Sequence, residues 1–148
     1  MNDIFCELLN YIESRPVIST HSHHMEDNFF KKFNLDTLLE NSYVNWCGVP
    51  LEKTPQGRTE YLNKVKFNSY FVWLQKSLQA LYNIDEPLSA GNWDTFSHKI
   101  ENAHKDENYH INVLRQKCKY HKVLLDAYRR PGSDNGHPDI FSPVFRIN

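Results

Sequence analysis

Three histidines, His21, His23 and His24, occur within four residues of the stretch VISTHSHHMEDNFF. Neutral imidazole is the side chain that most often binds zinc and related divalent ions. Side chains at positions i and i+2 of an extended segment point to the same side. We therefore expect His21 and His23 to bind one divalent metal ion, with zinc as the expected metal, and His24 to point elsewhere.

The residues before these histidines are expected to position them. Val17 to Thr20 are mostly β-branched and follow the helix-breaking Pro16, which predicts a short buried strand. A second buried strand is predicted from Lys122 to Tyr128, and residues 144–148 are expected to begin a third strand or a helix. Strands separated by helices favour an α/β fold with parallel pairing, so residues 17–20 and 123–127 should lie side by side and parallel.

Between these strands the apolar residues recur at helical spacing. The pattern predicts helices over residues 4–12, 35–39, 58–65, 69–82 and 92–103, and from Asp106 onwards. Asn34 or Asp36 is expected to cap the second helix, and Asn92 the fifth. One core is expected to form around Trp73, Leu74, Leu78, Leu81, Trp93 and Phe96.

Composition narrows the classes of function. The chain has 148 residues, enough for one domain, and a formal net charge of −1, which gives no reason to expect a nucleic-acid partner. Its three cysteines form no CxxC pair, so neither a thiolate zinc site nor a disulfide framework is indicated. No signal peptide or membrane-spanning run is visible, and a cytoplasmic location is expected.

Other polar residues fit supporting roles in such a site. Asp126 lies at the end of the second predicted strand, where it could hold a ligand histidine in orientation or, equally, make a structural hydrogen bond. Arginine binds carboxylates through two parallel hydrogen bonds, so three arginines are candidates for substrate binding. Three further residues could reach a metal or face the site, although loop residues of these types are more often plain surface. The arginines are Arg58, Arg129 and Arg130, and the remaining candidates are Glu26, Asp27 and His137.

Several metalloenzyme families begin with a strand and an HxH motif. The metallo-β-lactamase pattern H-x-H-x-D-H would need ligands where Met25 and Glu26 stand, and histidinol-phosphatase-type enzymes follow the motif with further strands instead of helices. VISTHSHH resembles the first-strand motif of the amidohydrolase superfamily. NSYFVWLQKSLQALYNIDEPLSAGNWDTFSHKIE resembles the helical insert of uronate isomerases, and LLDAYRRPGSDNGHPDIFSPVFRIN resembles the second strand and the loop after it.

The resemblance implies an α/β fold, the N-terminal fragment of a (β/α)₈ barrel with a mostly helical insert between the first two strands. Residues 1–33 would hold the first helix, strand and histidine loop, residues 34–119 the insert, and residues 120–148 the second strand. A full barrel needs about 250 residues, so we expect a partial domain of a metal-dependent hydrolase for a small-molecule substrate, inactive at this length. Uronate isomerisation and a non-catalytic helical interaction module are the alternatives, and unpaired strand edges would favour self-association.

Overall fold

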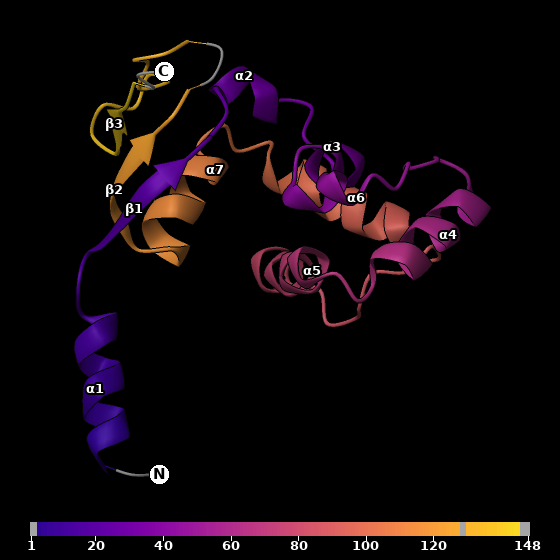
Figure 1. The fold of residues 1–148 in the computed structure, drawn as a ribbon, viewed down its shortest axis with the longest axis horizontal. Helices are drawn as coiled ribbons and strands as arrows, with labels where there is room; N and C mark the ends of the chain where they lie inside the picture. The colour runs from indigo at the N-terminus through magenta and orange to yellow at the C-terminus, as the bar shows by residue number, and fades with distance from the viewer. Residues whose placement is uncertain (1–2, 128–129, 146–148) are drawn as a thin grey trace. The chain divides into compact units, whose positions relative to one another are not determined.

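The computed structural model describes residues 3–127 and 130–145 of the chain. It divides into two compact units, which are described separately (Figure 1). The sheet unit consists of Met1–Asn28 and His110–Asn148, and the helical unit is the continuous segment Phe29–Tyr109. The fold is therefore mixed α/β, as the sequence predicts, with one long helical segment between the first and second strands.

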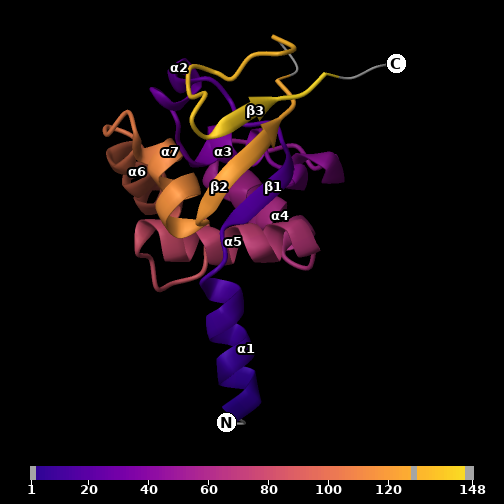
Figure 2. The same ribbon diagram turned by 90° about the vertical axis from the view of Figure 1, so that its left-hand side faces the viewer.

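The sheet has three parallel strands in the order β1 (Val17–Ser22), β2 (Tyr120–Leu125) and β3 (Phe141–Pro143), which Figure 2 shows side by side. Val17 pairs with Tyr120 at one end of β1, and Ser22 pairs with Leu125 at the other. The predicted parallel pairing of residues 17–20 with the second strand is thus confirmed. The carboxyl ends of β1 and β2 meet at one edge, because parallel strands run in the same direction.

Burial of β1 differs from the sequence-based expectation. Val17 and Ile18 are 40% and 56% exposed, and no residue of β1 is fully buried. The strand lies at the edge of the sheet and, among residues 3–127 and 130–145, pairs with β2 alone. β-branched residues favour an extended backbone, but they do not determine whether a second element covers the strand. The prediction of a buried first strand was therefore wrong.

β2 supplies the centre of the sheet core. Val123 and Leu125 are buried together with Ile140, which precedes β3, and Phe141, the first residue of β3. Ile111 packs on the same cluster. Ile111 belongs to α7 (Tyr109–Asn112), which continues as the π-helical turn η2 (Val113–Lys117). The helix expected from Asp106 onwards therefore begins three residues later and lies against the sheet.

The third strand also lies earlier than expected, at Phe141–Pro143 instead of within residues 144–148. Phe141 is buried against β2, and Pro143 has no N–H group to continue a ladder. Residues 146–148, like Tyr128 at the expected end of the second strand, lie outside the described residues.

Five helices form the body of the helical unit. Asn34 caps α3, its Oδ1 accepting from the Thr37 N–H at 2.9 Å, as predicted. α4 begins three residues before the predicted start, because Thr54 caps it and Pro55 occupies its first turn. Asn92 precedes α6, but its Oδ1 accepts from the Ser89 N–H and does not cap the helix. The elements are α3 (Leu35–Glu40), the 3₁₀ helix η1 (Tyr43–Cys47), α4 (Pro55–Val65), α5 (Ser69–Tyr82) and α6 (Trp93–Ala103).

The core of this unit contains some of the predicted residues and excludes one. Trp93, Phe96 and Leu78 are buried as expected, and Leu74 and Leu81 pack on them half-buried. Trp73, however, is 67% exposed. The buried face of α5 carries Phe71, Leu78 and Tyr82 instead, so the predicted stripe is displaced around the helix.

Two short helices complete the chain. α1 (Asp3–Glu13) agrees with the predicted first helix, and none of its residues is buried. α2 (Asp27–Phe30) follows the histidine loop and was not expected from the sequence. Within residues 3–127 and 130–145, no helix is both long enough and apolar enough to cross a membrane.

Candidate metal centre

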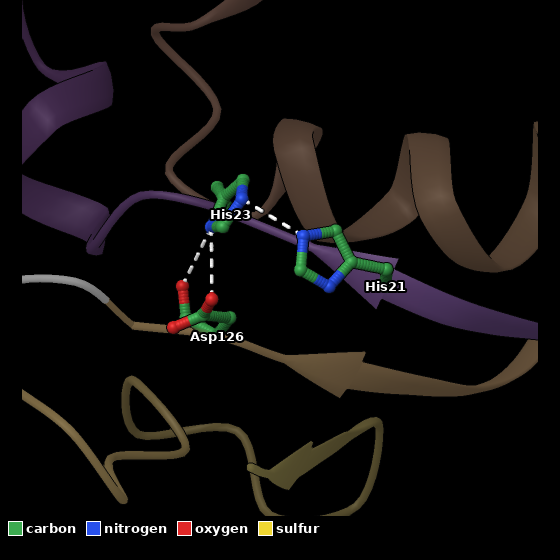
Figure 3. A group of neighbouring side chains, drawn as sticks. All are labelled: His21, His23 and Asp126. Carbon is green, nitrogen blue, oxygen red and sulfur yellow. Dashed lines mark hydrogen bonds and ion pairs between the residues drawn. The ribbon is translucent and has the colours of Figure 1, made fainter. Parts of the chain in front are cut away.

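His21 and His23 meet at the carboxyl end of β1 (Figure 3). His21 lies within the strand and His23 follows its last residue, so their side chains leave the backbone on the same side. Their Nε2 atoms are 2.9 Å apart, and the two rings are perpendicular. The structure therefore brings together the two residues that the sequence singled out as metal ligands.

Asp126 holds His23 from the opposite side of the imidazole ring (Figure 3). It directly follows β2, and its backbone carbonyl lies 2.9 Å from His23 Nδ1. A carbonyl oxygen can only accept, so Nδ1 carries a proton in this contact, and the neutral form of the ring then has the lone pair of Nε2 on the side of His21. The Asp126 carboxylate lies 3.9 Å from the same Nδ1. Carboxylates and carbonyls hold metal-binding histidines in this way in zinc sites.

These donor atoms fit a divalent metal ion. Two nitrogens bound to one tetrahedral zinc at about 2.0–2.1 Å are about 3.3 Å apart. The observed separation of 2.9 Å is close to that value, and a small rotation of either ring would reach it. His21, His23 and Asp126 form one of the groups whose donor atoms all lie within 4.8 Å of one another. The role predicted for Asp126, orienting His23, matches the side of the ring that it contacts.

A second group of donor atoms lies in the same unit. Asp27 Oδ1 is 2.8 Å from His137 Nε2 and 3.4 Å from His110 Nε2. His24, which points away from His23 as expected, has its Nε2 2.8 Å from His110 Nδ1. Burial, together with the neighbouring His110 and His137, lowers the pKa of His24 to about 3, so His24 is neutral near pH 7.

Only two of the three residues in this second group are among the candidates predicted from the sequence. The sequence predicts Asp27 and His137 separately, as residues that could reach a metal or face the first site. No sequence pattern points to His110, because it stands alone in a helical segment 86 residues beyond His24. Nothing in the local pattern connects the two positions, and only the packing of α7 against the sheet brings them together.

The candidate substrate-binding arginines already have partners or lie outside the described residues. Arg58 belongs to the helical unit, where it pairs with Asp94 at 2.9 Å and lies over the Trp93 ring. Arg130 pairs with Glu26 at 3.2 Å on an exposed surface of the sheet unit. Arg129 lies outside the described residues. A role for these arginines in substrate binding stays a prediction.

Comparison of the chain with models of known protein families, with curated proteins and with solved structures gives no match. What the site can bind is therefore inferred from its own donor atoms. Paired imidazole nitrogens, one with its tautomer fixed by a carbonyl, can bind a divalent ion at the carboxyl edge of a parallel sheet. Open α/β folds and barrels bind their ligands at this edge.

Proposed function

We propose that the chain forms the N-terminal part of a metal-dependent hydrolase of the amidohydrolase superfamily, with zinc bound by His21 and His23. One observation carries the proposal: the two Nε2 atoms meet at the carboxyl end of the first strand, where Asp126, directly after the next parallel strand, holds His23. The three free cysteines, Cys6, Cys47 and Cys118, fit a reducing compartment, and we propose the cytoplasm.

The sheet topology supports this proposal. Successive strands of a (β/α)₈ barrel are parallel and lie next to one another in chain order, with the binding site at their carboxyl ends. β1, β2 and β3 have that order and direction. In a closed barrel β1 would have a neighbour on both sides, which would cover the edge where Val17 and Ile18 are now exposed.

The chain's own residues would hold and orient the ion. His21 and His23 would donate through Nε2, and Asp126 would keep His23 in the tautomer that metal binding requires. Zinc supplies Lewis acidity, which polarises a scissile carbonyl and makes water a better nucleophile near neutral pH. The substrate would be a small molecule bound at the carboxyl edge of the sheet.

Zinc should bind weakly at this pair and only when both histidines are present. Two imidazoles fill half of a tetrahedral site, so the affinity should be far below that of a site with three or four protein ligands. On addition of zinc chloride we expect the side-chain nitrogen resonances of His21 and His23 to shift, as measured by ¹⁵N NMR of the histidine rings. His21→Ala should remove the shift of His23.

A matched control is available in His98→Ala, since His98 is exposed on α6 and belongs to neither donor group of the described residues. It should leave the zinc response of His21 and His23 unchanged. Resonances of these two histidines that do not move at millimolar zinc would remove the metal assignment, and with it the proposed function.

The exposed edge of β1 should also pair with a second copy of the chain. Unpaired strand edges bind other strands unless charged residues block them, and a lysine on the edge is a common block. We expect Ile18→Lys to weaken self-association by about tenfold or more in sedimentation equilibrium. Ile12→Lys is the control, because Ile12 is 65% exposed on α1, outside the sheet. A larger effect of Ile12→Lys would place the interface on α1 and contradict pairing through β1.

A further inference from the structure

Three donor atoms in the sheet unit converge from segments that are far apart in the sequence. Asp27 is the first residue of α2, His110 lies in α7, and His137 lies in the loop between β2 and β3. Asp27 Oδ1 is 2.8 Å from His137 Nε2 and 3.4 Å from His110 Nε2. Neighbouring donors on a tetrahedral zinc ion are about 3.3 Å apart, so both distances are within about half an ångström of that geometry.

His24 is placed to orient one of these donors. Its Nε2 lies 2.8 Å from His110 Nδ1, and the two rings are stacked with 5.1 Å between centroids. When His110 Nδ1–H donates to His24, the lone pair of His110 Nε2 faces Asp27. This is the arrangement in which a metal-binding histidine uses its second nitrogen for an outer hydrogen bond. The His24 carbonyl also accepts from Asn135 Nδ2 at 2.8 Å, which ties the β2–β3 loop to the same segment.

The three donor side chains differ in their exposure, which leaves one side of the group open to solvent. The His110 side chain is buried, that of His137 is one-fifth exposed, and that of Asp27 is half exposed. An ion among them would have two imidazole nitrogens and one carboxylate oxygen as ligands, with a water molecule on the open side. Zinc accepts this mixed set of nitrogen and oxygen donors in tetrahedral geometry.

We infer that Asp27, His110 and His137 form a second zinc site, distinct from the His21–His23 pair, that fastens the β2–β3 loop to α2 and α7. The position of His137 explains what such a site would stabilise. Its carbonyl accepts from the N–H groups of Ile140 and Phe141, at 3.1 and 2.9 Å, immediately where β3 begins. An ion bound through His137 would therefore hold the start of β3 in register with β2.

The test uses the full chain with His21→Ala and His23→Ala, so that the first pair cannot contribute. Titration with zinc chloride by calorimetry should show one equivalent bound. Cobalt(II), as a spectroscopic substitute, should give the visible absorption of a four-coordinate ion. Adding His137→Ala or Asp27→Asn to this background should weaken zinc binding by at least about tenfold. His98→Ala in the same background should leave it unchanged.

A second measurement separates the site from non-specific binding. Zinc should raise the Tm of the His21→Ala/His23→Ala protein and slow amide hydrogen exchange in residues 131–140, because it binds only the folded arrangement. Neither effect should survive His137→Ala. The inference fails if the background protein, folded by circular dichroism, binds no zinc, or if His137→Ala and Asp27→Asn leave binding unchanged. The first pair plays no part in this outcome, so the proposed function would stand or fall separately.

Discussion

Replacing Trp93 with alanine should lower the free energy of unfolding by about 3–5 kcal/mol, as for other large aromatic residues removed from a core. Trp93 is 1% exposed at the centre of the helical unit. Its Nε1–H donates to Asp36 Oδ1 at 2.8 Å, linking α6 to α3. The substitution therefore leaves a cavity and removes the partner of a half-buried carboxylate. Urea denaturation followed by far-ultraviolet circular dichroism would measure the loss.

Trp73→Ala is the matched control. Trp73 is 67% exposed, and the Lys76 ammonium lies 4.6 Å from its ring centroid on the solvent side of α5. Surface substitutions away from special features usually change stability by less than about 0.5 kcal/mol. Equal losses for the two tryptophans would show that the core does not have Trp93 at its centre.

The contrast between buried Trp93 and exposed Trp73 shows how far helical periodicity predicts which residues form a core. The stretch YFVWL at the start of α5 is so rich in apolar residues that two overlapping stripes fit a repeat of 3.6 residues. One stripe runs through Tyr70 and Trp73, and the other through Phe71, Leu78 and Tyr82. The helix is predicted well because both stripes require one, but only packing against the rest of the helical unit selects the stripe that is buried.

Elements defined by local chemistry were the most predictable. The Asn34 side chain caps α3 by accepting a hydrogen bond from a residue three positions later, and Pro16 ends the segment before β1. Neighbouring residues therefore encode both boundaries. The pairing of β1 with β2 followed from the order of strands and helices. The exposure of β1 did not, because burial depends on what covers the edge of a sheet and not on the composition of the strand.

The two donor groups differ in predictability for the same reason. His21 and His23 are two residues apart on an extended segment, so their convergence follows from the geometry of a strand. Asp27, His110 and His137 are brought together by the packing of α7 and by the return of the chain into β3. Spacings of tens of residues carry no periodic signal, and such a group appears only once the sheet is assembled.

Purified protein of these 148 residues should show no measurable hydrolysis of simple esters or amides, and no isomerisation of uronates, even with zinc or manganese in excess. A catalytic zinc site uses three protein ligands and keeps a position for water, whereas the pair at β1 offers two imidazole nitrogens and uses Asp126 to orient one of them. The proposed hydrolase also needs a base and loops that hold the substrate. Because such groups act as a unit, lacking several of them lowers the rate by several orders of magnitude.

The assay should include His21→Ala and His137→Ala, each matched by His98→Ala. Background activity that is equal in all four proteins would come from a contaminant and would agree with the prediction. Turnover that disappears in His21→Ala would contradict it and would mean that a second copy completes the first site, which the Ile18→Lys protein could then test. Turnover that disappears only in His137→Ala would contradict it differently, because Asp27, His110 and His137 would then bind an ion that reacts and does not merely hold the β2–β3 loop in place.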